Sequence, residues 1–379
     1  MNKIYYRQLK VVYIEVTNKC NINCKYCYET QKKLNKQVFT KELFAHIIDN
    51  VARYSCYDEI SIIFHGGEPL LVSTDFYEYC FAYATTTLET VGKSASFGLQ
   101  SNLMLLQNDL IPLLLKYSVG VSTSIDGPQS IHDEARSGWK MTIENMKKLR
   151  DAGVKVNFIT VCSQHNQHHI ADIFNFARDF NYKTCQISIA SCVKSINPES
   201  TYSPLTEDEI FAIYKAILNC WMNTGIHEKN MEVMLQRYLN PDIDFIHTHQ
   251  CESPFCYAGY HMLVFTPDKK IHLCSPAVPL ASQYPEFIAG SVDDIDSSQQ
   301  LLHAMSVFHQ KDEKYMQVCP ECEAACICSF GCPAFDRIDP VTASEKCKAT
   351  KRFYEYLKTL NKQELIDIIS MPYESNSNR

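Results

Sequence analysis

The sequence has no long hydrophobic run, no excess of basic charge and no internal repeat, and each absence excludes a class of protein. No apolar run approaches the ~18–20 residues that cross a membrane, and the N-terminal segment lacks the apolar centre of a signal peptide. A net charge of −7 gives no basic excess, which argues against nucleic acid as the main partner. We therefore expect a cytosolic protein without a membrane or nucleic-acid partner.

Length and composition indicate a globular enzyme. The 379 residues leave room for one core of roughly 200–250 residues and a smaller second unit. Apolar residues make up 46% and charged residues 21% of the chain, as in ordinary soluble proteins.

Cysteine is the residue present in excess, with 18 copies. A disulfide scaffold would be short and secreted, and this chain shows neither property, so the excess indicates metal binding. Three cysteines share one early segment, and eight between residues 251 and 347 have cluster-like spacing. The remaining cysteines are Cys56, Cys80, Cys162, Cys185, Cys192, Cys220 and Cys326. Most of them stand singly in apolar segments, where a buried thiol acts as a small hydrophobe.

Cys20, Cys24 and Cys27 form a C-x3-C-x2-C cluster directly after a strand-like run at residues 11–17. Three thiolates on one loop can hold three irons of a four-iron cluster and leave the fourth iron without a protein ligand. Zinc is the alternative metal. Structural zinc sites usually close with a fourth Cys or His in a readable pair, which is missing from the next segment. Ligand softness and geometry also favour iron–sulfur.

Strand-like and helical segments alternate over residues 1–225, with apolar residues at three- and four-residue spacing in the helices and caps such as Thr40 and Thr206. The strands are expected at 11–17, 59–64, 95–100, 119–125, 154–161 and 184–190, and the helices near 40–53, 75–91, 108–117, 140–152, 168–181 and 206–224. Six such units predict a parallel sheet with helices on its outer face. Six strands are too few to close an eight-stranded barrel, so the sequence predicts a partial (β/α)6 barrel of α/β class with its reactive groups at the strand ends.

The alternation stops after residue 225. Residues 226–250 are expected to form a helical linker, and residues 251–369 a cysteine-rich second domain. That domain should contain a hairpin with strands at 261–265 and 270–273 and a helix at 344–368. The tail, 370–379, has the composition of a disordered segment.

A Gly-Gly-Glu-Pro segment, Gly66, Gly67, Glu68 and Pro69, follows the second strand. Paired glycines let a ligand or another backbone approach closely. The residue before a proline is held extended, so Glu68 can present its carboxylate to a cationic amine. In isolation the same four residues would form an ordinary turn.

In this order, the cysteine loop with Tyr26 before its last cysteine and the segment Gly66–Pro69 resemble the radical S-adenosylmethionine (SAM) enzymes. The resemblance implies that the open iron chelates SAM and that Tyr26 and Gly66–Pro69 belong to the cofactor site, the latter binding the amino group. Ser124 and Arg136 match the S-x-D-G-P…R segment of the peptide- and sulfatase-modifying branch. There the serine contacts the ribose and the arginine the carboxylate, for which a planar guanidinium is suited. Residues 100–102 resemble a Q-T-N segment that faces the active-site cavity.

The C-terminal cysteines resemble the SPASM extension, which carries two auxiliary four-iron clusters. The resemblance assigns Cys256, Cys274 and Cys332 to one cluster, with Cys251 a candidate fourth ligand, and Cys319, Cys322, Cys328 and Cys347 to the other. Lys269 replaces a glycine of the pattern. Cys326 is left out because Cys328 fits the spacing on both sides. Two zinc ribbons are the alternative.

Two histidine groups, at residues 165–169 and 247–249, offer possible metal ligands. Such residues are more often polar loop and cap positions, and we interpret them so.

The resemblance implies three [4Fe-4S] clusters, SAM, a flavodoxin or ferredoxin as electron donor, and a radical that removes hydrogen from a peptidyl side chain. In sulfatase maturases an aspartate base follows the last hairpin cysteine, where this chain has Ser275. Serine does not accept a proton at neutral pH without help. The expected function is therefore a maturase that forms a C–C or thioether crosslink within a ribosomally made precursor peptide.

Formylglycine formation on a sulfatase is the alternative, and a non-catalytic iron–sulfur carrier or scaffold is an alternative of another class. No catalytic residue is identified. With no domain before the first strand, the precursor is expected to dock elsewhere or through a separate protein.

Overall fold

A computed structural model gives the fold of the chain and describes residues 4–29, 37–190, 200, 202–242, 251, 255–293, 298–310 and 318–371. Its main sheet has nine strands in the order β11-β10-β9-β1-β2-β3-β4-β5-β7. The strands of this sheet are β1 (Val11–Thr17), β2 (Glu59–Gly66), β3 (Ser94–Gln100), β4 (Gly120–Ser124), β5 (Val156–Cys162), β7 (Ile187–Ile189), β9 (Met262–Phe265), β10 (Lys270–His272) and β11 (Ile288–Ser291). The strands from β9 to β7 pair in parallel, whereas β10 pairs antiparallel with β9 and β11. The predicted α/β partial barrel is confirmed.

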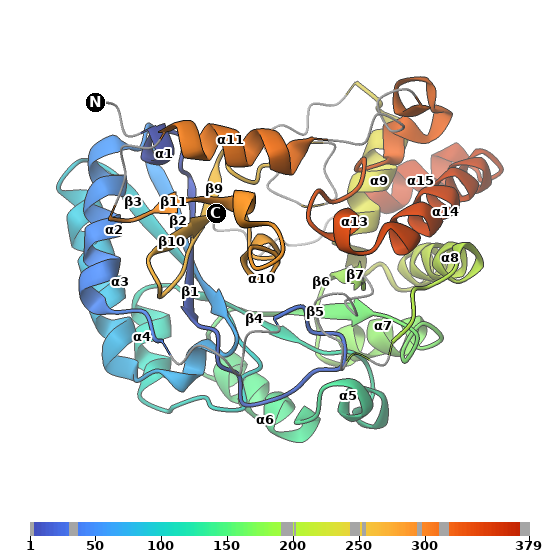
Figure 1. Cartoon of the computed structure of the whole chain (residues 1–379). Helices are drawn as coiled ribbons and strands as arrows, with labels where there is room; N and C mark the ends of the chain where they lie inside the picture. The colour runs from blue at the N-terminus through green and yellow to red at the C-terminus, as the bar shows by residue number, and fades with distance from the viewer. Residues whose placement is uncertain are drawn as a thin grey trace.

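Helices cover the convex face of this curved sheet (Figure 1). The helices of the barrel half are α1 (Ile4–Arg7), α2 (Lys41–Tyr54), α3 (Thr74–Glu89), α4 (Leu110–Lys116), α5 (Gln129–Ala135), α6 (Trp139–Asp151), α7 (Ile170–Asp179) and α8 (Glu207–Thr224). Thr40 caps α2 through the backbone N–H of Leu43 at 3.1 Å, and Thr206 forms a capping box with Glu209 at the start of α8. Both predicted caps are confirmed.

Alternation along each strand separates the core from the lumen of the barrel. In β2 the outward residues Ile60, Ile62 and Phe64 are fully buried. The Phe64 ring lies 6.1 Å from Phe44 of α2 and 5.6 Å from Phe81 of α3, centroid to centroid. The residues that alternate with Ile60, Ile62 and Phe64 along β2 are only half-buried and face the lumen. The apolar face of the sheet is thereby sealed by helices, while the concave face stays polar and accessible.

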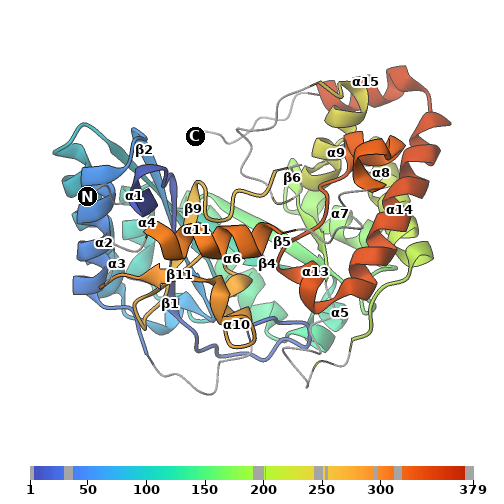
Figure 2. The same cartoon turned by 45° about the horizontal axis from the view of Figure 1, so that its top comes forward.

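The second half of the chain packs on both ends of this sheet (Figure 2). It contains β8 (His227–Glu228), the helices α9 (Lys229–Leu239), α10 (Ala277–Leu280), α11 (Ser298–His309), α13 (Phe335–Ile338), α14 (Pro340–Lys358) and α15 (Lys362–Ser370), and the short 3-10 turns η3 (Pro285–Phe287), η4 (Cys319–Glu321) and η5 (Glu323–Ile327). In the first half, β6 (Thr184–Cys185) pairs with β8, and the 3-10 turn η2 (Pro69–Leu71) follows β2. α14 lies against α8, where the Phe353 and Tyr214 rings are 5.3 Å apart.

Several elements differ from the sequence predictions. The strand expected at 184–190 is divided into β6 and β7, and the helix expected at 344–368 is divided into α14 and α15. The expected hairpin forms, but β9 joins the barrel sheet beside β1, with Val11 opposite Met262. Part of the predicted linker forms α9, and its remainder, like the predicted disordered tail beyond residue 371, lies outside the described residues. The domain boundaries stay a prediction.

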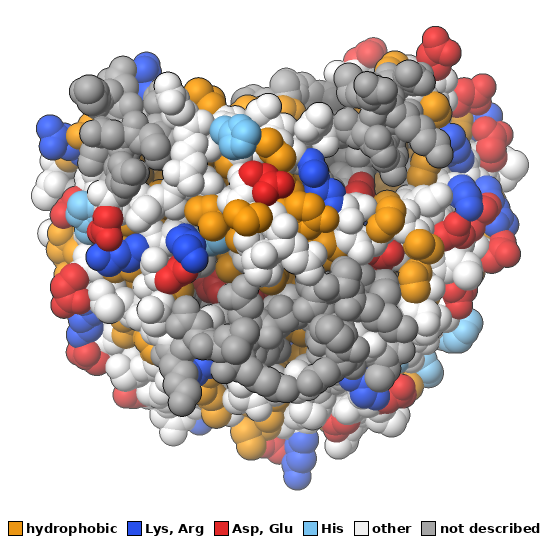
Figure 3. Space-filling model, viewed as in Figure 1, with side chains coloured by type: hydrophobic (Ala, Val, Ile, Leu, Met, Phe, Trp, Pro, Cys, Tyr) orange, Lys and Arg blue, Asp and Glu red, His pale blue; other side chains and the backbone are white. Residues whose placement is uncertain are grey.

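Two further findings bear on partners. Within the described ranges, no helix is long and apolar enough to cross a membrane. Figure 3 shows that acidic and basic side chains are interspersed over one face of the molecule rather than gathered by sign.

Candidate functional site

The loop that carries Cys20, Cys24 and Cys27 leaves β1 at the carboxyl end of the parallel strands. Cys24 is buried and the other two thiols are half-buried. A turn closes the loop, because the N–H of Cys27 donates to the carbonyl of Cys24 at 3.1 Å, and the N–H of Lys25 donates to Ala135 at 2.9 Å. The three thiols are thus held on one short segment at the mouth of the barrel.

The two glycines after β2 explain how this loop is fixed. The N–H of Gly67 donates to the Thr17 carbonyl at 2.8 Å, and the N–H of Glu68 donates to Lys19 at 2.7 Å. A Cβ on Gly67 would overlap the Lys19 carbonyl, and one on Gly66, whose φ is +118°, would lie 2.5 Å from the Thr17 oxygen. Only glycine permits this contact between the two backbones. Gly66 and Gly67 therefore hold the cysteine loop directly.

Glu68 is buried, and its carboxylate is occupied by the protein itself. It accepts hydrogen bonds from Ser101 Oγ at 2.7 Å and from the backbone N–H groups of Asn102 and Leu70, both at 2.9 Å. Burial raises the pKa of Glu68, while these hydrogen bonds and the charge of Arg136 oppose the rise. Its carboxylate thus joins the loops after β2 and β3.

Asn102 continues this connection toward the cysteines. Its Nδ2 donates to Asn21 Oδ1 at 2.8 Å, next to Cys20. The predicted 100–102 segment thus lies at the site, although the contact to Asn21 has no sequence signal of its own.

Tyr26, Asp126 and Arg136 form a hydrogen-bonded group beside the loop. The Tyr26 hydroxyl donates to the Asp126 carboxylate and accepts from Arg136 Nη1 at 3.0 Å. Burial alone would lower the pKa of Arg136, but the neighbouring Tyr26, Cys24 and Asp126 raise it above its ordinary value. A fixed, fully charged guanidinium thus lies near Cys24 and Glu68. Sequence reasoning gave no role to Asp126, which the structure places at the centre of this group.

The lumen of the barrel lies above these residues. Ser124, at the end of β4, and Gln100, at the end of β3, are half-buried on the concave face. Burial lowers the pKa of His65 to about 4. The pKa of Tyr13 is raised to about 12, first by burial and then by Cys251 and Cys274. The Tyr13 side chain therefore lies within electrostatic reach of the C-terminal thiols Cys251 and Cys274.

Four of those thiols gather at one place. Burial raises the pKa of Cys274 well above its usual range, and the neighbouring Cys332, Cys256 and Cys251 raise it further. The half-buried Cys332 also accepts a hydrogen bond from the N–H of Phe335 at 3.5 Å. These are the four cysteines of the predicted first auxiliary set, and their role as ligands stays a prediction.

The remaining thiols form a second group on η4, η5 and α14. Burial raises the pKa of Cys328, and Cys347 and Cys319 are among its neighbours. Cys347 in turn neighbours Cys319 and Cys322. Cys326 lies within η5 and its Sγ contacts the Glu323 carbonyl at 3.7 Å.

The thiols of the three groups are donors of the type that iron–sulfur clusters use. Within the described ranges, no three Cys, His, Asp or Glu side chains converge so as to hold one metal ion. A four-iron cluster binds each thiolate at a different iron. The donors present therefore fit iron–sulfur clusters.

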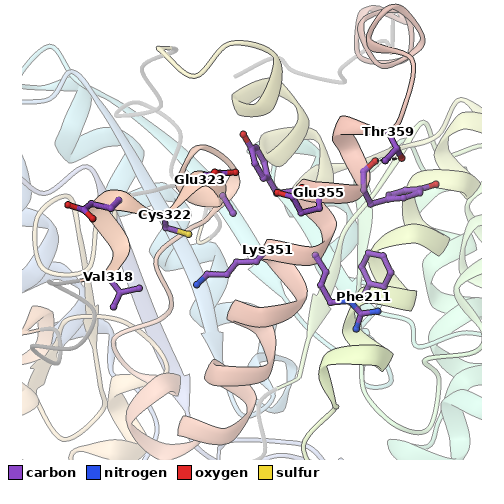
Figure 4. A pocket seen from close by; sticks show the side chains of 12 residues that line it. Phe211, Val318, Cys322, Glu323, Lys351, Glu355 and Thr359 are labelled. Carbon is purple, nitrogen blue, oxygen red and sulfur yellow. Dashed lines mark hydrogen bonds between the residues drawn. The ribbon is translucent and has the colours of Figure 1, made fainter.

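The second group opens to the surface (Figure 4). A groove of about 900 Å³ runs between α14 and the segment that carries Cys322, and Phe211 of α8 also lines it. Figure 4 shows Lys351 extending from α14 toward that segment.

The histidines of residues 165–169 have separate surroundings. His169 precedes α7 and pairs with Asp172 at 2.8 Å, and His168 is exposed. The His165 ring stacks on Tyr26 with 5.9 Å between centroids, and its Nδ1 contacts Ser163 at 2.6 Å. His247 and His249 lie outside the described residues.

Comparison with known proteins agrees with this geometry. Residues 14–177 match the model of the Radical SAM superfamily. A serine-type anaerobic sulfatase-maturating enzyme of Bacteroides thetaiotaomicron is 27% identical over 173 residues, covering 43% of this chain and 41% of its own length. The radical SAM cyclopropyl synthase TigE of Paramaledivibacter caminithermalis is 27% identical over 221 residues, covering 54% and 45%. This chain thus matches less than half the length of both relatives.

Among solved structures, native anSMEcpe with bound AdoMet superposes with a TM-score of 0.78 at 17% identity, covering 96% of this chain and 100% of that one. The same protein has been solved with AdoMet and the Cp18Cys peptide. At this identity the likeness establishes the fold.

Proposed function

We propose that this chain forms an intramolecular crosslink in a ribosomally made precursor peptide. The chain belongs to the radical SAM superfamily. Within it, the chain is a SPASM-type maturase of the sulfatase-maturase-like, peptide-modifying kind. Cys20, Cys24 and Cys27 would hold a four-iron cluster, and Gly66–Pro69, Tyr26, Ser124 and Arg136 would surround the bound SAM. When bound, the cluster and SAM would supply the radical chemistry that removes hydrogen from an unactivated carbon. The protein's part is to fix the cysteine loop and to present a charged Arg136 to a carboxylate.

The eight C-terminal thiols would hold two auxiliary clusters, for three [4Fe-4S] clusters in all. The electrostatic influence of Cys251 and Cys274 on Tyr13, which faces the lumen, supports a role of the first group near the substrate. The groove beside Cys322 supports electron exchange between the second group and a separate redox protein such as flavodoxin or ferredoxin.

Ser275 is the residue on which the choice between crosslinking and formylglycine formation rests. It is half-buried between β10 and α10, one residue after Cys274, and its carbonyl accepts from the N–H of Val278 at 3.1 Å. A hydroxyl at this position is a poor base at neutral pH. Oxidation of a substrate thiol or hydroxyl to an aldehyde needs a base there, so the site is better suited to coupling two side chains. The name of TigE, a cyclopropyl synthase, supports carbon–carbon bond formation in this branch.

Arg136→Ala should weaken SAM binding roughly 10- to 100-fold, because a hydrogen bond to a charged group contributes about 1.5–3 kcal/mol. Iron content should stay the same, since Arg136 is not a cluster ligand. The SAM affinity of Arg136→Lys should lie between those of the wild type and Arg136→Ala, because an ammonium lacks the planar fork of a guanidinium. Equilibrium binding of SAM to reconstituted protein measures this. Arg178→Ala, at an exposed position of α7, is the matched control. Unchanged affinity in Arg136→Ala would show that the guanidinium does not face SAM.

The reaction product distinguishes crosslinking from formylglycine formation. With its own precursor peptide, the enzyme should give a product lighter by two hydrogens, and fragment ions between the joined residues should be missing. An aldehyde product would leave those fragment ions intact and react with hydrazides. Mass spectrometry before and after hydrazide treatment decides. A hydrazide-reactive product would replace the crosslinking proposal by sulfatase maturation.

The alternative of a non-catalytic iron–sulfur carrier or scaffold predicts neither product. It gives no reason for the close contact of Gly66–Glu68 with the cysteine loop, because a carrier has no use for a SAM site.

A further inference from the structure

A second, smaller cavity of about 190 Å³ lies between the end of β1, the β9–β10 hairpin and α10. Eight polar residues contribute to its wall, namely Glu15, Asn18, Glu29, Thr266, Asp268, Lys270, His272 and Ser282. Cavities that hold whole small-molecule ligands measure ~300–1,000 Å³. This cavity has room for one side chain rather than for a complete cofactor.

Three carboxylates line the cavity. Glu15 is 3% exposed and Glu29 6% exposed, and Asp268 is the third acid. Among the described lining residues, Lys270 is the one cation, and its Nζ lies 2.8 Å from Asp268. Burial raises the pKa of Glu15 well above its usual range, and Glu29 and Asp268 raise it further. A cation placed in the cavity would offset both effects, since buried carboxylates are stabilised by pairing.

Two buried polar atoms at the cavity have no partner in the described part of the chain. His272 is 2% exposed, and its Nδ1 makes no hydrogen bond. Asn18 Oδ1 is likewise buried and unsatisfied. Buried polar atoms are nearly always hydrogen-bonded, so these two indicate a missing partner, which for the carbonyl oxygen of Asn18 must be a donor. Because the carboxylates and imidazole do not converge on one point, a metal ion does not fit, and an organic cation does.

The cavity also lies between the two places where chemistry is expected. The hydroxyl of Tyr28 is within electrostatic reach of Glu29, Cys27, Glu15 and Cys274. Glu29 follows the last cysteine of the loop by two residues, and His272 precedes Cys274 by two. A group bound here would therefore be held between the cysteine loop and the first auxiliary thiols.

We propose that this cavity binds the charged end of a lysine or arginine side chain of the precursor peptide, with Glu15 as its main partner. The inference rests on the proposed function and adds a substrate class: a peptide with a basic residue at or near the modified position. An ammonium or guanidinium supplies three to five donors, which match the acceptor oxygens of Glu15 and Asn18.

Calorimetric titration of the anaerobically reconstituted holoenzyme, saturated with SAM, tests this directly. The probes are Nα-acetyl-lysine amide and Nα-acetyl-arginine amide, each compared with its neutral analogue, Nα-acetyl-norleucine amide or Nα-acetyl-citrulline amide. At least one cationic probe should bind about tenfold or more tightly than its neutral analogue, and Glu15→Gln should remove that preference. Asp268→Asn, on the hairpin turn, should reduce it less. Glu144→Gln makes the same chemical change on the exposed face of α6 and should leave the preference intact.

Cluster absorbance and melting temperature show whether Glu15→Gln is folded, and Asp268→Asn gives a second test if it is not. Equal affinity of wild type for cationic and neutral probes, or a preference that survives both substitutions, would overturn the inference. SAM cleavage by the wild type is measured separately. Its absence would count against the proposed function, whereas cleavage without a cation preference would reject this inference alone.

Discussion

Replacing Cys20, Cys24 and Cys27 together by Ala is expected to abolish SAM cleavage and to remove about four of about twelve irons. The three thiols stand on one short loop, and no other described Cys, His, Asp or Glu side chains converge there to replace them. The two C-terminal groups are built from separate segments, so their irons should remain. Iron analysis and the absorbance of the reconstituted protein measure the first effect, and chromatography of the cleavage products measures the second.

Cys56→Ala is the control for this experiment, because Cys56 is exposed and stands alone in sequence. It should retain all iron and full cleavage. Stoichiometric zinc with little iron in the wild type, or full iron in the triple variant, would be incompatible with a cluster on this loop.

Gly67→Ala is expected to have the second-largest effect, although it adds one methyl group. The added Cβ would overlap the Lys19 carbonyl, which is backbone and cannot rotate away. The loop would have to move and lose the hydrogen bonds from Gly67 to Thr17 and from Glu68 to Lys19. Overpacking of this kind costs about 1–3 kcal/mol. We expect a melting temperature several degrees lower and SAM cleavage reduced at least about tenfold.

Gly120→Ala is the matched control within the same sheet. A Cβ at Gly120 of β4 would meet its nearest atom, the Phe97 carbonyl oxygen, at 3.8 Å, an ordinary contact. This variant should cleave SAM at the wild-type rate. Normal cleavage by Gly67→Ala would show that the contact between the loops is not needed to hold the cysteines in place.

The sequence predicted the parts of the site that are local in the chain. The cysteine loop and the segment Gly66–Pro69 each lie at a strand end, and the order of strands and helices from residue 11 to 224 was recognisable from apolar spacing. These signals are local because a strand, its turn and the next helix are set by neighbouring residues.

The sequence did not predict contacts between distant segments. β9 pairs with β1 although about 250 residues separate Val11 from Met262, and such pairing has no periodic signal. The partners of Glu68 are 33 and 34 residues away in sequence, at Ser101 and Asn102. Glu68 was expected to meet the amine of SAM, and that role stays a prediction beside the loop contacts now seen. The acidic cavity at Glu15 was missed for the same reason.

The most direct test of the central claim is anaerobic reduction of the reconstituted wild type in the presence of SAM. A radical SAM maturase should release 5′-deoxyadenosine and methionine in equal amounts, and a precursor peptide deuterated at its modified carbon should transfer deuterium to the 5′-deoxyadenosine. Radical chemistry on the cysteine loop predicts both results for the wild type and neither for the triple cysteine variant. A fully iron-loaded, reduced wild type that leaves SAM intact would contradict it.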